Sequence, residues 1–238
     1  MTADEPTGFL YPFIEADEQD AGALLADLAA SARGKIAESH RLQAATISAR
    51  AEQLDALATE MAHRFASGGR LFTFGNGGSA TDAEMAAELF RRPPDASVYG
   101  ISRSAEISRT QNGLAAISLV ADQAVLTALA NDVGVELVFS RQLIAHGRRG
   151  DMAMGFSTSG GSPNVLRAFA EGRARGLLTV GLAGYGGGAM AGSTDLDQCL
   201  VVESDSVHRI QEAQAALVHA LWEQVQARLA SGPDEGTG

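Results

Sequence analysis

The chain has 238 residues, with 18 Lys and Arg against 29 Asp and Glu, and therefore a formal net charge of −11. This balance argues against a nucleic-acid partner, because such binding needs a basic surface that displaces counterions. The single cysteine, Cys199, excludes an intrachain disulfide framework and fits a reducing compartment; the sequence contains neither a signal-peptide pattern nor 18 consecutive apolar residues. We therefore expect a cytoplasmic protein that has no membrane partner.

Helical periodicity dominates the beginning of the chain. Residues 1–18 mix Pro, Gly, acidic and aromatic residues and are predicted to form an N-terminal arm. Residues 19–68 carry apolar residues at helical spacing and predict two helices, broken near Gly34 or Thr46. These helices are expected to belong to one domain, 19–230, and residues 231–238 read as a disordered tail.

From residue 69 onward, short apolar runs alternate with helical patterns. This alternation predicts an α/β fold, in which a doubly wound parallel sheet carries helices on both faces. Ligands bind such sheets beyond the carboxyl ends of the strands. Strands are predicted at 71–74, 115–119, 152–156, 177–182 and 199–202, and helices at 79–90, 122–130, 135–146, 162–175 and 207–229.

An insertion at residues 91–113 interrupts the alternation. It holds four Arg against one Asp and one Glu, and its net charge of +2 contrasts with the acidic chain. Two interpretations stay open: a solvated surface insertion, or a mobile cationic flap over an anionic site.

Two loops have the composition of phosphate-binding loops. The first, Gly75-Asn76-Gly77-Gly78-Ser79, follows a predicted strand and opens a helix. Glycines let the backbone approach an anion closely, the helix start offers unpaired N–H groups, and Asn76 and Ser79 add side-chain donors. We call this segment the glycine loop.

The second loop, Ser157-Thr158-Ser159-Gly160-Gly161-Ser162, has the same layout and four hydroxyl groups. Pro163 suits the first helical position, with Ser162 as the cap. Several short donors in a small concavity are what a phosphate dianion needs. We call this segment the serine loop.

Two other interpretations compete with a phosphate site. Either loop alone could be a tight, well-capped turn, but two such loops at the carboxyl ends of strands favour a ligand. The segment Gly75-x-Gly77-x-x-Ala80 also satisfies a dinucleotide fingerprint. That fingerprint requires an acidic residue at the end of the next strand, whereas Asp95 lies in a Pro-rich loop, so no nucleotide cofactor is expected.

At these loops the sequence resembles the sugar isomerase (SIS) domain family, most closely its phosphoheptose isomerase branch. The matching segments are LFTFGNGGSATDAEMAAEL, AISLVADQAVLTALAND, GDMAMGFSTSGGSPNVLRA and RIQEAQAALVHAL. The resemblance implies a three-layer sandwich with a five-stranded parallel sheet and extra N-terminal helices. It also implies a homotetramer with sites at subunit interfaces, and conversion of D-sedoheptulose 7-phosphate to D-glycero-D-manno-heptose 7-phosphate.

The resemblance also implies roles for individual residues. On this basis the phosphate is held by Ser157, Thr158, Ser159 and Ser162, and the sugar is contacted by Asn76, Gly77, Gly78, Ser79, Asp132 and Gln211. An aldose–ketose isomerisation needs a base and an acid, which the family supplies at Glu88 and His219. By pattern alone, Glu88 could equally be a solvated carboxylate and His219 a core histidine.

One departure from the family pattern bears on metal binding. The family usually reads GNGGSxxDAxHxxxE, but this chain is one residue shorter between Ser79 and Glu88 and lacks the His. Either Glu84 or Met85 takes its place, and zinc accepts a carboxylate oxygen far better than a thioether. Two outcomes stay open: a zinc ion held by Glu84, Glu88, Gln211 and His219, or no metal.

Three functions remain in view from the sequence. The first is the phosphoheptose isomerase activity. The second is a non-catalytic phosphosugar-binding regulator or adaptor, suggested by the missing His and the insertion. The third is isomerisation of another phosphosugar.

Overall fold

The structure is a computed structural model that describes residues 21–92 and 113–231. The expected arm at 1–18, nearly all of the 91–113 insertion and all but the first residue of the expected tail lie outside these ranges. The described residues before Leu42 form a unit of their own within α1 (Ala21–Ala49). Several of its apolar side chains are exposed, namely Leu24, Leu25, Leu28 and Ile36. In the described ranges no helix has the length and apolarity to cross a membrane.

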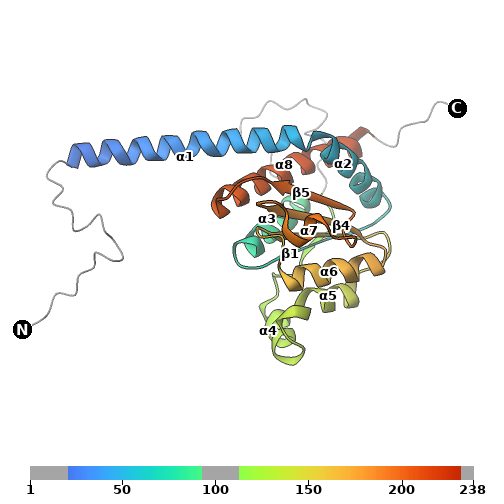
Figure 1. The fold of residues 1–238 in the computed structure, drawn as a ribbon. Helices are drawn as coiled ribbons and strands as arrows, with labels where there is room; N and C mark the ends of the chain where they lie inside the picture. The colour runs from blue at the N-terminus through green and yellow to red at the C-terminus, as the bar shows by residue number, and fades with distance from the viewer. Residues whose placement is uncertain (1–20, 93–112, 232–238) are drawn as a thin grey trace, which may run out of the picture. The chain divides into compact units, whose positions relative to one another are not determined.

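The second unit, from Leu42 onward, is built on a five-stranded sheet in the order β2-β1-β3-β4-β5 (Figure 1). All four strand pairs are parallel, which confirms the predicted α/β fold with a doubly wound sheet. The central strands β1, β3 and β4 are buried along their whole length, as expected for a parallel sheet covered on both faces. The strands are β1 (Leu71–Gly75), β2 (Ala116–Ser118), β3 (Met152–Ser157), β4 (Leu178–Gly184) and β5 (Gln198–Val202).

Helices cover both faces of the sheet, and each face has its own apolar core. The core under α2, α3 and α8 includes Met152 and Met154 of β3, whereas Ala153 between them belongs to the core under α5 and α6. This alternation follows from the two-residue period of a strand. The helices of this unit are α2 (Ala51–Ala66), α3 (Gly78–Arg91), α4 (Gln123–Asp132), the 3₁₀ turn η3 (Val135–Leu137), α5 (Val138–His146), α6 (Pro163–Ala174), α7 (Gly188–Ala191) and α8 (Val207–Ser231).

A glycine inside β3 allows tight packing in the core under α5 and α6. A Cβ atom at Gly155 would lie 2.5 Å from the Phe169 ring and 2.6 Å from the Phe74 ring. Without it, Phe74 packs against Phe169 and Phe139 with ring centroids 5.3 and 5.4 Å apart. Such tilted contacts are favourable for aromatic pairs. The rings fix α5 and α6 against the strand that leads into the serine loop.

The structure corrects the sequence analysis at two places. The first helix continues through both Gly34 and Thr46, and the break falls at Arg50, whose N–H donates back to the carbonyls of Thr46 and Ile47. An internal Gly costs a helix only about 1 kcal/mol, which the flanking residues can offset. The short helix α7 was not predicted, because its glycine-rich sequence carries no helical period.

Candidate active site

The two loops meet where the order of the strands in the sheet reverses, between β1 and β3. β1 and β3 are adjacent, with Gly75 paired to Phe156, and the chain leaves β1 for α3 on one face and β3 for α6 on the other. Such a switch point leaves a crevice at the carboxyl ends of the two strands. The topology therefore places the glycine loop and the serine loop side by side at this edge.

A pair of side-chain amides joins the two loops. Nδ2 of Asn76 donates to Oδ1 of Asn164 at 2.8 Å, and Nδ2 of Asn164 donates back to Oδ1 of Asn76 at 2.9 Å. Asn164 is only 6% exposed and sits in the first turn of α6. The sequence analysis did not single out Asn164, although its position two residues after the Ser162 cap could have drawn attention to it. The pair fixes the orientation of Asn76 at the mouth of the site.

The glycine loop is shaped by close backbone contacts. Gly77 has φ = 56°, in the left-handed region that favours glycine. A Cβ atom at Gly78 would lie 2.4 Å from Nε2 of Gln211, so α8 approaches the start of α3 directly. Ser79 is buried in the first turn of α3, so its side chain does not line the mouth of the site.

Three hydroxyl groups of the serine loop converge. Oγ of Ser157 lies 2.9 Å from Oγ of Ser162 and 3.4 Å from Oγ of Ser159, to which the Gly161 N–H donates at 3.3 Å. Ser162 makes no side-chain capping hydrogen bond, so its hydroxyl is not committed to the amides of α6. We call Ser157, Ser159, Gly161 and Ser162 the hydroxyl cradle. Its donors and the positive end of α6 suit a phosphate group.

The end of β4 and the backbone that follows it hold the cradle in place. The Gly184 N–H donates to the carbonyl of Thr158, and the Met190 N–H donates to the carbonyl of Gly160. Gly160 has φ = 63°, and a Cβ atom there would lie 2.0 Å from the carbonyl oxygen of Gly187. The serine loop is therefore packed backbone against backbone, which leaves little freedom to its hydroxyl-bearing residues.

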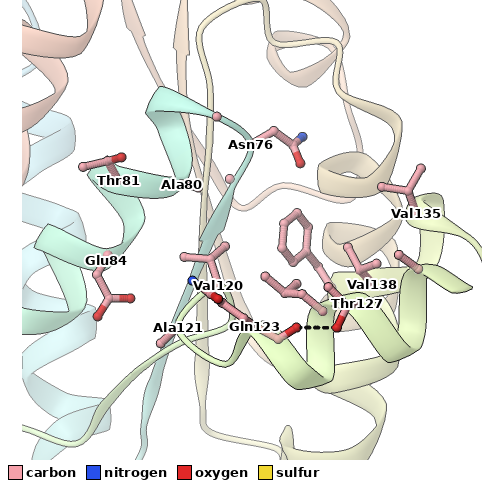
Figure 2. Close-up of a pocket in the computed structure, with 15 residues that line it drawn as sticks. Asn76, Ala80, Thr81, Glu84, Val120, Ala121, Gln123, Thr127, Val135 and Val138 are labelled. Atoms are coloured by element: carbon pink, nitrogen blue, oxygen red, sulfur yellow. Dashed lines mark hydrogen bonds between the residues drawn. The ribbon is translucent and has the colours of Figure 1, made fainter.

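A cleft of about 720 Å³ opens beside the glycine loop (Figure 2). One wall is α3 and the opposite wall is α4 with the start of α5. Apolar side chains form much of its floor, and Glu84 is the acidic residue among those that line it. Oε2 of Glu84 is buried and has no hydrogen-bond partner among the described residues. The lining residues are Gly75, Asn76, Gly77, Ala80, Thr81, Glu84, Val120, Ala121, Gln123, Leu126, Thr127, Ala130, Val135, Val138 and Phe139.

Gln211 of α8 contacts a different face of α3 from the face that lines the cleft. Its Nε2 donates to Oδ2 of Asp82 at 3.0 Å. Burial raises the pKa of Asp82, and the hydrogen bond from Gln211 offsets part of this rise. Gln211 thus anchors α8 to the first turns of α3.

The two residues expected to transfer protons, Glu88 and His219, are both exposed. The side chain of Glu88 is 40% exposed and forms ion pairs with Arg91 and Arg92. The hydrogen bond from Arg91, together with the charges of both guanidinium groups, lowers the pKa of Glu88. His219 is 49% exposed, with Nε2 3.7 Å from Glu223 and its ring against Trp222.

Asp132, the other expected sugar contact, ends α4 and accepts a hydrogen bond from Asn131 at 2.8 Å. It is exposed and lies outside the cleft lining, whereas Thr127 and Ala130 of the same helix line it.

The proposed zinc ligands do not assemble within one chain. Glu84 lines the cleft and Gln211 faces Asp82, while His219 lies eight residues further along α8, roughly 12 Å in axial rise. In residues 21–92 and 113–231, no group of three or more His, Cys, Asp or Glu side chains could hold a metal ion. Within one chain, the described residues therefore do not form the zinc site that the resemblance implied.

Comparisons with known proteins agree with this architecture. A family model described as the SIS domain matches residues 36–184. A phosphoheptose isomerase of Paramagnetospirillum magneticum is 44% identical over 194 residues, which cover 81% of this chain and 93% of that protein. One from Roseiflexus sp. is 41% identical and covers 77% of this chain and 86% of that protein. The solved structure of a Neisseria gonorrhoeae phosphoheptose isomerase superposes with a TM-score of 0.71 at 32% identity, over 84% of this chain and all of that one.

The amide pair can be tested by removing Asn164. In Asn164→Ala both hydrogen bonds are lost and the polar groups of Asn76 lose their partner, so we expect the free energy of unfolding to fall by about 1–3 kcal/mol. Urea denaturation measures the change. The matched control, Asn131→Ala on the exposed end of α4, is expected to change stability by less than about 0.5 kcal/mol. Equal losses in the two variants would contradict the bracing role.

The buried carboxyl of Asp82 predicts a pH dependence. Because its pKa is raised in the folded protein, protonation favours folding, and this contribution is lost as the pH rises through the folded-state pKa. The side-chain amide introduced by Asp82→Asn stays neutral at every pH and keeps an acceptor for Gln211. We therefore expect the variant to gain stability relative to the wild type as the pH rises from about 3 to about 6, measured by urea denaturation.

A second variant checks the cause of that pH dependence. Gln211→Met removes the donor that lowers the pKa of Asp82, and should steepen the wild-type pH dependence. A stability difference between Asp82→Asn and the wild type that does not vary with pH would contradict the assignment.

Proposed function

The chain belongs to the SIS domain family, in its phosphoheptose isomerase branch, and we propose from this that it converts D-sedoheptulose 7-phosphate to D-glycero-D-manno-heptose 7-phosphate. The observation that carries the proposal is the hydroxyl cradle, set beside a sugar-sized cleft in a chain 44% identical to a named phosphoheptose isomerase. A non-catalytic regulator is not favoured, because the relatives are named as enzymes.

The phosphate is proposed to bind in the hydroxyl cradle. The hydroxyls of Ser157, Ser159 and Ser162 and the first amides of α6 supply short donors to its oxygens. Thr158, which the resemblance adds to this set, is held through its carbonyl by Gly184. Because the chain carries a net charge of −11, such local donors must offset long-range repulsion of a dianion.

The sugar is proposed to extend from the cradle into the cleft. Asn76 lines the cleft and is fixed by Asn164, so its amide can contact the sugar hydroxyls at a defined position. Gly77 and Gly78 allow the chain to approach the sugar closely. The resemblance adds Ser79, Asp132 and Gln211 to this set. In one chain, however, Ser79 is buried, Asp132 lies outside the cleft lining and Gln211 contacts Asp82.

The reaction moves a proton between adjacent carbons through an enediol. A base removes a proton from C1 of the open-chain ketose, the C1–H electron pair forms the C1–C2 double bond, and O2 is protonated. The hydroxyl proton then leaves O1, the C1 carbonyl forms, and C2 receives a proton. The resemblance expects a carboxylate of α3, Glu88, as the base, and His219 as the group that serves the oxygens.

Exposed site residues support a site completed by a second copy of the chain. His219 and Glu88 are both exposed, on different helices, and the described part of one chain does not bring them together. We propose that the protein is a homotetramer with its sites at subunit interfaces. The exposed apolar side chains of α1, Leu24, Leu25, Leu28 and Ile36, are candidates for burial in this assembly. The composition, with one cysteine, supports a cytoplasmic enzyme.

Activity and the cradle can be tested together. We expect the purified chain to convert D-sedoheptulose 7-phosphate, followed by NMR of the aldose product. In Ser162→Ala a hydrogen bond to a charged group is lost, so KM should rise by about tenfold or more. The matched control is Ser67→Ala, whose hydroxyl donates to the carbonyl of His63 at the opposite edge of the sheet and which should keep the wild-type KM. No turnover of this substrate by the wild type would overturn the proposed function.

The assembly can be tested by placing charges on α1. We expect light scattering of the wild type to give four times the chain mass of 24.7 kDa. Leu25→Lys combined with Leu28→Lys should yield smaller species with lower activity per chain, because charged groups are costly to bury at an interface. Ile144→Lys, at an exposed apolar position on α5, serves as the control. A fully active monomer would contradict the interfacial site.

A further inference from the structure

A second pocket opens at the amino ends of the strands, at the opposite edge of the sheet from the glycine loop and the serine loop. It has a volume of about 340 Å³ and lies between the end of α2 and the residues that lead into β1, β3 and β4. It is therefore separate from the cleft and from the hydroxyl cradle. We call it the arginine pocket, after Arg64, Arg70, Arg148 and Arg149, which all line it. We propose that it binds a small anion with two phosphate groups, of the diphosphate class, and this inference is independent of the proposed function.

Positive charge exceeds negative charge in the arginine pocket. Its four arginines stand against two acidic residues, Glu60 and Asp151, which leaves a net charge of +2. The whole chain carries a net charge of −11, so the pocket is a local exception in a molecule whose long-range field repels anions. An anion that binds here must be held by direct contacts with the arginines.

Both acidic residues of the pocket are already paired. Oε1 of Glu60 accepts a hydrogen bond from Nε of Arg64 at 2.5 Å. Asp151 is only 4% exposed; its Oδ1 accepts from the Arg70 N–H at 2.9 Å, and its Oδ2 accepts from Nη2 of Arg70 at 2.8 Å and from the Arg148 N–H at 2.9 Å. Each carboxylate thus pairs with one guanidinium group, and Asp151 also shapes the turn that carries Arg148 and Arg149.

The guanidinium groups of Arg148 and Arg149 have no such partner. Both residues are exposed, and among the described residues neither side chain makes a hydrogen bond or an ion pair. Gly176 has φ = 76°, and a Cβ atom there would lie 3.3 Å from Cζ and Nη1 of Arg149, so the guanidinium group lies against the backbone of Gly176. Each guanidinium group offers five N–H donors in a planar fork that matches the oxygens of a phosphate.

The turn that carries these two arginines is held from both sides. Nη1 of Arg64 on α2 donates to the Asp151 carbonyl at 3.1 Å, and Nη2 of Arg70 donates to the His146 carbonyl at 2.6 Å. A Cβ atom at Gly69 would lie 2.5 Å from the Gly150 carbonyl oxygen, so the two backbone segments are in direct contact. The backbone positions of Arg148 and Arg149 are therefore fixed before any ligand binds, which lowers the entropic cost of binding.

The size and the lining of the pocket indicate the class of ligand. A volume of about 340 Å³ is at the low end of the range for small-molecule sites, and no Phe, Tyr or Trp is found among the described residues that line the pocket. A nucleobase would therefore gain no contact with such a ring. A single carboxylate or phosphate engages one guanidinium group and leaves the other unpaired, whereas a diphosphate engages both through bidentate hydrogen bonds.

Chemical protection of the arginines tests the location of the site. Inorganic pyrophosphate is the probe, added to the full chain in about 0.15 M chloride, which screens non-specific attraction. We expect pyrophosphate to protect Arg148 and Arg149 from modification by phenylglyoxal, measured by mass spectrometry of the peptides. Arg141 on α5, which is also exposed and without a partner among the described residues, should react as before. No protection of Arg148 and Arg149, or equal protection of Arg141, would overturn the proposal.

Calorimetry tests the contribution of the two arginines to affinity. Arg148→Gln combined with Arg149→Gln should weaken the Kd for pyrophosphate by about tenfold or more, because hydrogen bonds between charged groups are lost. The matched control, Arg141→Gln, should keep the wild-type affinity, and melting temperatures report the folding of each variant. Ser162→Ala, in the hydroxyl cradle, should leave the protection of Arg148 and Arg149 unchanged. Affinity that falls in Ser162→Ala but not in the double variant would place all binding in the cradle and contradict the arginine pocket.

Two further ligands distinguish the sources of the diphosphate chemistry. Fructose 1,6-bisphosphate carries two phosphates on a sugar, and ADP carries a diphosphate on a nucleoside. We expect both to compete with pyrophosphate for the double-arginine site, with ADP no tighter than pyrophosphate. Binding of ADP that is tighter by about tenfold or more, as stacking of a base would produce, would contradict the assignment to a small anion.

Discussion

The reciprocal amide hydrogen bonds between Asn76 and Asn164 are the contact on which the site depends. They cross the switch point of the sheet and join a loop that leads to one face with a loop that leads to the other. Without such a link, two loops that are 81 residues apart in the chain, counted from Asn76 to Ser157, would share only the pairing of β1 with β3. The amide pair ties the loop that lines the cleft to the helix that follows the hydroxyl cradle.

The proposed phosphate site relies on short-range donors. Ser157, Ser159 and Ser162 present hydroxyls without a lysine or arginine among the cradle residues, and the N-terminus of α6 adds partial positive charge. Donors of this kind act only at hydrogen-bond distance, so their positions must be held accurately. The backbone contacts of Gly160 and Thr158 with the segment after β4 supply that rigidity. Glycine is required at residue 160 because any side chain would collide with the Gly187 carbonyl.

Three faces of α3 make different contacts. One face packs into the core, a second meets Gln211 of α8 through Asp82, and a third lines the cleft through Thr81 and Glu84. A helix of regular register cannot present Glu84 and Asp82 to the same place, so the cleft and the Gln211 contact are separate parts of the site region. The exposure of His219 is consistent with the proposed interfacial site, in which a second copy of the chain brings an imidazole to the cleft.

The sequence by itself determined the fold class, the two loops and the family. Apolar runs of strand length that alternate with helical periods specify a parallel sheet. GNGGS and STSGGS lie at the carboxyl ends of the buried strands β1 and β3, where their glycines permit tight turns. The tertiary structure decided three other features: the role of Asn164, the break at Arg50, and the different surroundings of Glu84 and Glu88. Spacing along a helix gives the angle of a side chain about the helix axis, but it does not give the residues that this side chain contacts. Glu84 and Glu88 lie on the same face of α3. Only the tertiary structure shows that the cleft reaches Glu84 but not Glu88, and that Glu88 forms ion pairs with two arginines.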